Sequence, residues 1–158
     1  PTRALGGRFV NFYNGKRRDV WREAIGMAVS DDLYHWRRVG NGPVVENGEP
    51  GHAAISGDPM IRRIGDLWVM FYFGYKWKPG EKGAFDTFAC SRDLVHWRKW
   101  EGVPLVRPSE PWDCKHAHKP WVVKHNGIVY HFYCAVGEKG RALALAVSEL
   151  KKVRLDEI

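Results

Sequence analysis

The sequence of 158 residues lacks a hydrophobic run long enough to cross a membrane as a helix. Its longest uncharged apolar stretch runs from Leu67 to Tyr75, far short of the roughly 20 residues that such a helix needs. It also lacks a positively charged start followed by an apolar core, the pattern of a secretory signal peptide. Because the chain starts at Pro1 rather than Met, this second absence says little. We expect no membrane partner.

Cysteine is also scarce. Cys90, Cys114 and Cys134 are odd in number and widely spaced, which excludes a disulfide framework and a structural zinc pattern. Cys90 and Cys134 lie in apolar runs typical of strands, so we expect buried, reduced thiols that behave as small hydrophobes.

A continuous stripe of positive charge is absent as well. The 25 Lys and Arg exceed the 18 Asp and Glu, but they are scattered singly and in pairs. A net charge of +7 favours anionic partners only weakly. Binding of nucleic acid would need a continuous basic surface, so we expect no nucleic-acid partner.

No segment keeps a helical period over three turns. Aromatic residues make up 13% of the chain, together with 17 Gly and 9 Pro. Strands separated by tight turns need this composition. The sequence therefore predicts an all-β fold.

The chain contains an internal repeat. The segment Ala28–Trp36 returns 61 residues later as Ala89–Trp97, and Pro59–Phe73 returns at the same offset as Pro120–Cys134. A further copy begins at Pro1. Repeats of this length indicate arrays of one supersecondary unit.

Each copy predicts a four-stranded meander. An inner strand follows the proline, and a turn (Gly6-Gly7, Gly65-Asp66 or Asn126-Gly127) leads into an aromatic second strand (Val10–Tyr13, Trp68–Tyr75 or Val129–Val136). The third strand ends at Ser30, Ser91 or Ser148, and the fourth carries Trp36 or Trp97. Such a sheet cannot bury both faces alone, so the expected fold is a β-propeller. We place the blades at about 1–58, 59–119 and 120–158, which is two and a half to three blades.

The two signatures Ser-Xaa-Asp-Leu-Xaa-His-Trp and Asp58-Pro59 resemble those of the five-bladed β-propeller glycoside hydrolases, families 43, 32, 68 and 117. The resemblance extends over the whole chain through its repeats, and it implies that the chain is about half of a five-bladed ring. It further implies an active-site funnel at the propeller axis, where acidic residues begin the inner strands of successive blades. One carboxylate acts there as base or nucleophile, the next orients substrate, and the third blade supplies the general acid.

Strand direction divides the polar residues between the two ends of each blade. The inner strand starts at the same end as the loop between strands two and three, so the Ser-Asp-Leu-His-Trp elements lie opposite the funnel. Asp32 and Asp93 are therefore expected to cap turns, and Trp36 and Trp97 to pack between blades.

Asp58 directly precedes Pro59 and matches the second-blade aspartate of the resemblance. In the third blade, the glutamate expected two residues before the proline is replaced by His118. A histidine in that place is similar to family 117 enzymes, which cleave anhydrogalactose from agar oligosaccharides. Imidazole can donate a proton near neutral pH, and we expect Asp58 to raise the pKa of His118. The alternatives are that His118 binds an axial metal or water, or belongs to a non-catalytic propeller.

The first-blade carboxylate is expected directly before Pro1, outside the sequence. Substrate-binding candidates come from the loops that enter the funnel; they are His52, Tyr75, Trp77, Trp112, Asp113, His116 and Lys119. Tyr75 and Trp77 begin an inserted loop, Lys76–Asp86, where aromatic rings could stack on sugars or simply pack the loop. Glu49 also precedes the funnel, and Glu110 or Asp113 is the alternative acid.

The sequence predicts a glycosidase that cleaves O-glycosidic bonds of oligo- or polysaccharides, with Asp58 and His118 as catalytic residues. Arg17, Arg18, Lys76, Lys78 and Lys119 extend the expected partners to anionic carbohydrates. No cofactor is expected, with a structural divalent cation at the axis left open. The rival hypothesis is a non-catalytic glycan-binding propeller.

Overall fold

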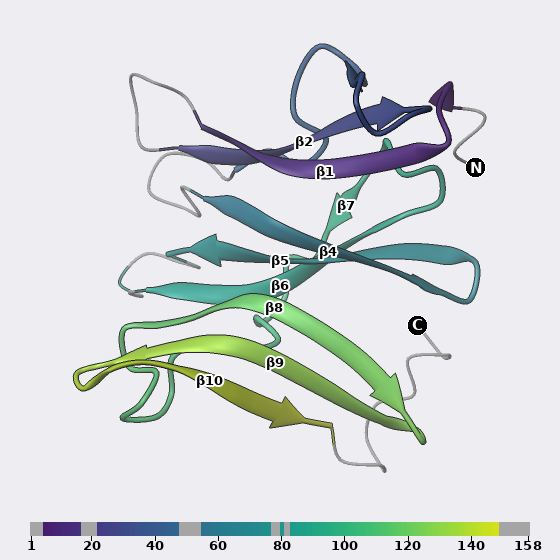
Figure 1. Cartoon of the computed structure of the whole chain (residues 1–158). Helices are drawn as coiled ribbons and strands as arrows, with labels where there is room; N and C mark the ends of the chain where they lie inside the picture. The colour runs from purple at the N-terminus through teal and green to yellow at the C-terminus, as the bar shows by residue number, and fades with distance from the viewer. Residues whose placement is uncertain (1–4, 17–21, 48–54, 77–79, 81–82, 149–158) are drawn as a thin grey trace.

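The protein is described by a computed structural model covering residues 5–16, 22–47, 55–76, 80 and 83–148. It is all-β within these residues, with three antiparallel sheets stacked side by side (Figure 1). No helix among the described residues is long and apolar enough to cross a membrane.

The sheets follow one another along the chain. The first comprises β1 (Phe9–Lys16), β2 (Glu23–Ser30) and β3 (Arg37–Arg38). The second comprises β4 (Ser56–Ile64), β5 (Leu67–Tyr75), β6 (Ala84–Ser91) and β7 (Arg98–Lys99). The third comprises β8 (His116–His125), β9 (Ile128–Gly137) and β10 (Gly140–Val147). Neighbours in each sheet are consecutive in the chain, which is the up-and-down order of propeller blades. The chain thus folds as part of a β-propeller.

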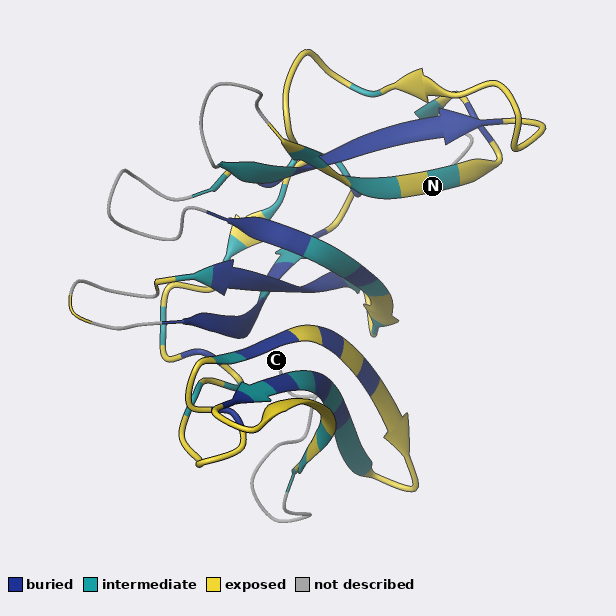
Figure 2. Ribbon diagram, turned by 60° about the vertical axis from the view of Figure 1, so that its left-hand side comes forward, coloured by how far each residue is buried: buried dark blue, intermediate teal, exposed yellow. Residues whose placement is uncertain are grey.

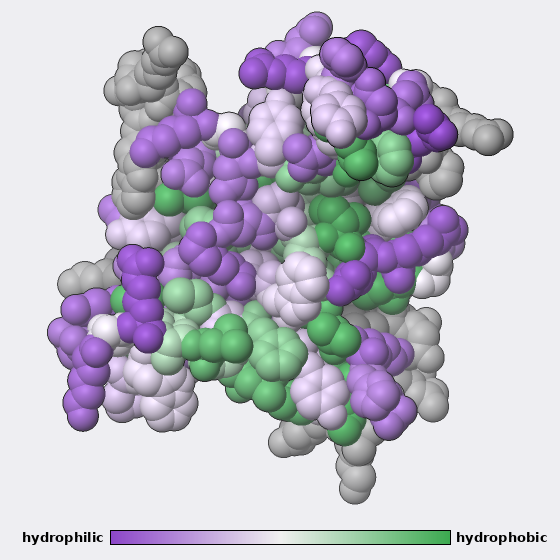
Figure 3. Space-filling view, viewed as in Figure 1, coloured by the Kyte–Doolittle hydropathy of each residue, from purple (hydrophilic) through white to green (hydrophobic). Residues whose placement is uncertain are grey.

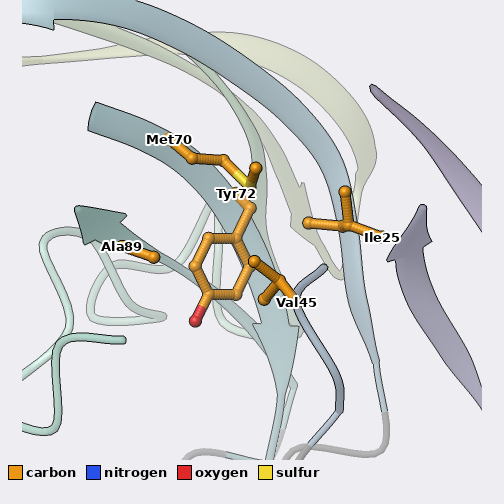
Figure 4. Packing of buried hydrophobic residues seen from close by; sticks show 5 residues of the cluster. All are labelled: Ile25, Val45, Met70, Tyr72 and Ala89. Carbon is orange, nitrogen blue, oxygen red and sulfur yellow. The ribbon is translucent and has the colours of Figure 1, made fainter. Parts of the chain in front are cut away.

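The second sheet lies between the other two, and this explains its composition. β5 is a nearly continuous apolar run because both of its faces are covered. One cluster, formed by Ile25, Val45, Met70, Tyr72 and Ala89, joins the first sheet to the second (Figure 4). Figure 2 shows the buried strands of the second sheet in the middle of the stack.

β10 shows the alternative pattern, with alternating exposure along the strand. Its Leu143, Leu145 and Val147 are exposed. On the face shown in Figure 3, hydrophobic side chains gather over the third sheet. One face of this sheet is thus left uncovered by the described residues.

The predicted turns and strand ends match the structure closely. Asn126 and Gly127 both adopt positive φ (49° and 79°), as a tight Asn-Gly hairpin requires. β2 and β6 end at Ser30 and Ser91. The serine and aspartate side chains of both Ser-Asp-Leu-His-Trp elements bond the following backbone N–H groups, as expected of turn caps. The Trp97 ring packs edge-on against Phe12 of the first sheet, with 5.8 Å between ring centroids.

Several expectations were wrong in detail. Trp36 and Trp97 precede β3 and β7 rather than lying in them, because each indole bonds a carbonyl of its own turn. The loop after β5 ends at Gly83, because pairing of Tyr75 with Ala84 already starts β6. Cys114 is exposed, since it lies in the loop before β8. The inner strand expected after Pro1 is absent from the described residues, because Leu5 to Arg8 are turn-like and residues 1–4 lie outside them.

Candidate functional site

The candidate site lies at the ends where β4 and β8 begin. Asp58 in β4 and Lys119 in β8 occupy equivalent repeat positions, 61 residues apart, and their side chains form an ion pair between sheets. Both residues have positive φ (48° and 65°), and both interrupt the strand register just before a proline. A non-glycine residue in this conformation costs about 1–3 kcal/mol, and such strain clusters at functional sites.

Asn14 of β1 completes this contact from the first sheet. Its Nδ2 donates to Asp58 Oδ1 at 2.9 Å, and the Asp58 N–H donates to Asn14 Oδ1 at 2.8 Å. One carboxylate thus joins residues from all three sheets. Sequence reasoning missed Asn14, which stands where the second aromatic strand has Phe73.

His118 begins the third sheet beside this group. Its ring is buried and lies edge-on to Phe73, with 5.4 Å between centroids. Nδ1 lies 3.0 Å from the Cys134 carbonyl oxygen, which can only accept, so Nδ1 carries a proton. Nε2 is therefore the ring atom whose protonation changes with pH.

Burial lowers the pKa of His118, and the charges of Lys119, His116 and Arg141 lower it further. The expectation that Asp58 raises this pKa was wrong. The reason is that Lys119 pairs with the Asp58 carboxylate, while the positive charges act on a ring that is already buried.

His116 lies two residues before His118, with 5.7 Å between the ring centroids and 6.0 Å to the Tyr75 ring. Its Nδ1 accepts a hydrogen bond from the Ala84 N–H at 3.1 Å, which favours the neutral ring. Burial and the nearby Arg141 and Lys115 lower its pKa. The structure thus brings Tyr75, His116, His118, Lys119 and Asp58 to the same end of the stacked sheets.

Trp112 and Asp113 differ sharply in exposure although they are adjacent. Trp112 is 57% exposed, whereas Asp113 is buried. Asp113 Oδ1 accepts from the N–H groups of Ser109 and Glu110, and Oδ2 accepts from the Tyr133 hydroxyl at 2.9 Å. The Asp113 carboxylate is therefore committed to holding its loop. His52 and Trp77 lie outside the described residues, as do Glu49, Arg17, Arg18 and Lys78.

A divalent cation would need several carboxylate or imidazole ligands together. Among the described residues, no three His, Cys, Asp or Glu side chains are grouped so that they could hold a metal ion. The ammonium group of Lys119 instead supplies the positive charge beside Asp58. These residues do not fit an axial cation.

The comparisons place this geometry among the glycoside hydrolases. No protein-family model matches the chain. A solved structure described as a glycoside hydrolase is 42% identical over 94% of the chain and 43% of its own length, with a TM-score of 0.81. A structure described as a complex of BT0996 and RGII is also 42% identical, over 96% of the chain and 45% of its own length, with a TM-score of 0.81. The family 117 glycoside hydrolase Zg3597 of Zobellia galactanivorans, at 18% identity over 81% of the chain and 39% of its own length, shares the fold with a TM-score of 0.64.

Among curated proteins, Rv1502 of Mycobacterium tuberculosis, described as uncharacterized, is 30% identical over 77% of the chain and 40% of its own length. The chain spans less than half the length of these relatives. Its structural neighbours are propeller-type glycoside hydrolases, and the chain has the fold of part of their propeller.

Proposed function

We propose that the protein is a glycosidase that cleaves O-glycosidic bonds in oligo- or polysaccharides. The observation that carries this proposal is the Asp58 carboxylate, held by Asn14 and Lys119 from the neighbouring sheets, with Lys119 directly following His118 in β8. The 42% identity to a glycoside hydrolase supports the same chemistry.

In this mechanism His118 protonates the leaving oxygen through Nε2. The Cys134 carbonyl fixes the ring by accepting from Nδ1, so only Nε2 exchanges its proton with substrate. A lowered pKa makes the imidazolium a stronger acid, although less of it is present at neutral pH. Asp58 orients sugar hydroxyls, and the base or nucleophile is expected directly before Pro1.

The finer part of the proposal concerns charge. Lys119 lies at the site, and the positive charges of Lys115 and Arg141 act on its histidines. A substrate carboxylate could pair with Lys119 and displace Asp58 from it. We therefore propose anionic carbohydrates as the substrate class, with the exposed Trp112 ring as a surface on which a sugar could stack.

One observation favours the non-catalytic rival. Asp58 is already neutralised by an ion pair, and His118 is mostly unprotonated at neutral pH because its pKa is lowered. A site of this kind would bind glycans without turnover.

The test is hydrolysis by the intact protein at its natural length. His118→Ala should slow cleavage strongly for glycosides with poor leaving groups and little for activated aryl glycosides, because only poor leaving groups need the acid. His125→Ala, at the exposed far end of the same strand, is the matched control. Equal losses for both substrate types would exclude the acid role, and binding without release of sugar would favour the rival.

A further inference from the structure

The buried interface between the second and third sheets contains a charge where the repeat predicts an apolar residue. Asp86 in β6 stands 61 residues after Ile25 in β2, and both side chains are fully buried. Their backbones are equivalent too, since the Ile25 N–H donates to the Val45 carbonyl at 2.9 Å and the Asp86 N–H donates to the Val106 carbonyl at 2.8 Å. The second sheet thus has an acidic side chain at a position that the first sheet fills with isoleucine.

The partner of Asp86 shows the same exchange. His131 in β9 stands 61 residues after Met70 in β5. Ile25 and Met70 lie together in the apolar cluster between the first two sheets (Figure 4). Between the second and third sheets, the Asp86 Oδ2 and His131 Nε2 atoms lie 2.9 Å apart, with both residues buried. The chain therefore uses two solutions, one apolar and one polar, for equivalent contacts.

The polar solution is the less stable one on physical grounds. Replacing a buried ion pair by well-packed apolar residues is often neutral or stabilising. Here the second oxygen, Asp86 Oδ1, is buried without a hydrogen-bond partner in the described structure, which adds a further cost. Because stability alone does not favour the pair, its position relative to the candidate site becomes informative.

Asp86 lies next to that site through Phe73. The two residues are direct partners across β5 and β6. The Phe73 ring is 5.4 Å from the His118 ring and 5.7 Å from Lys119 Nζ. Any adjustment of the third sheet against Asp86 therefore moves His118 and Lys119 relative to Asp58.

We propose that the buried Asp86–His131 pair is a protonation-dependent contact, in which Asp86 acts as a positioning residue that holds His118 and Lys119 against Asp58. Burial raises the pKa of Asp86 to about 7, and the Asp58 charge raises it further, while His131 opposes the shift. The ionisable groups on the elements around Asp86 are His131 and Tyr133 from β9, Asp58 from β4, and His116, His118 and Lys119 from β8.

The sign of the pH effect follows from this shift. Between its ordinary value near 4 and about 7, the native carboxyl keeps a proton that the unfolded chain has lost. The contribution of Asp86 to stability is therefore complete below pH 4 and disappears as the pH rises to 7. His116 and His118 act in the opposite direction, because their pKa values are lowered, but they are unchanged in the variants compared.

The first experiment measures urea unfolding of the intact protein at pH 5 and pH 8. Asp86→Asn keeps the side-chain shape and removes the titration, so its stability should change with pH in a way that lacks the downward contribution of Asp86. The double variant Asp86→Ile/His131→Met transfers the apolar pair of the first interface. It should be at least as stable as wild type at pH 8, while each single change is destabilising. The same pH dependence in wild type and both variants would overturn the proposal, as would additive effects of the two single changes.

The second experiment tests positioning and rests on the proposed function. If the protein hydrolyses glycosides, the alkaline limb of its kcat/KM profile should contain two ionisations in wild type, from His118 and Asp86, and one in Asp86→Asn. An unchanged profile would reduce Asp86 to a structural role and contradict the proposal. If no glycoside is cleaved, the proposed function fails, but the unfolding experiment still decides on the protonation-dependent contact.

Discussion

Lys119 stands in the third sheet at the position that Asp58 holds in the second, and the two side chains pair with each other. A repeat that places a carboxylate at one strand start has acquired the opposite charge at the next. The pair is half exposed, with 34% of the Asp58 side chain and 50% of the Lys119 side chain accessible. Substrate can therefore reach both groups, and an ion pair of this exposure contributes little to stability, at most about 1 kcal/mol.

Replacing Lys119 by Met should separate binding from folding. We expect a change of less than about 1 kcal/mol in the free energy of unfolding. Affinity for uronate-containing oligosaccharides should fall about tenfold, since a charge-assisted hydrogen bond is worth roughly 1.5–3 kcal/mol, while neutral oligosaccharides are little affected. Titration calorimetry on the intact protein measures both ligands. Lys124→Met, at the far end of β8, is the charge-matched control, and equal losses for neutral and anionic ligands would exclude a role in charge recognition.

Replacing Asn14 by Ala should weaken the contact between the first two sheets. The change removes two hydrogen bonds to Asp58, so we expect a loss of about 1 kcal/mol in the free energy of unfolding. Chemical denaturation measures this loss. Asn11→Ala on the same strand is the control, and a loss of equal size there would mean that strand propensity rather than the Asp58 contact is responsible.

The pH dependence of hydrolysis should report His118. The protonated ring is the active form, and its pKa is lowered from the ordinary value of 6.5, chiefly by burial. The kcat/KM value should therefore begin to fall at a pH below 6.5 as the pH rises, and Lys119→Met should move this limb to higher pH by removing a neighbouring positive charge. A limb that stays in place in that variant would contradict the electrostatic assignment.

Replacing Asp93 by Ala should destabilise the turn opposite the site. Asp93 Oδ1 accepts from the N–H groups of Val95 and His96, and Oδ2 lies 2.7 Å from His96 Nδ1. We expect a loss of about 1 kcal/mol at pH 7. These bonds lower the pKa of Asp93, so its contribution is present above pH 4 and decreases as the carboxylate becomes protonated in acid. Thermal melts of wild type and variant should therefore converge in strong acid, and a constant difference would contradict this account.

The repeat made much of the fold predictable, because the Asn-Gly turn, the aromatic second strands and the serine-terminated third strands are local signals. Asp58 and His118 were found in the same way, from their positions before a proline. The ion pair with Lys119 and the bonds to Asn14 were not found, since they depend on how neighbouring sheets face each other. Asp86 was placed in a loop because its charge hides a strand; its alignment with Ile25 was the signal that could have identified it.

The central claim is that Asp58 and His118 belong to a glycosidase. The most direct measurement is the release of reducing sugar from anionic oligosaccharides by the intact protein, comparing wild type with Asp58→Asn, His118→Ala and His125→Ala. The account predicts release by wild type and His125→Ala and a loss of at least about a hundredfold in the other two variants, the scale of general acid catalysis. Release that continues undiminished in Asp58→Asn and His118→Ala would contradict it.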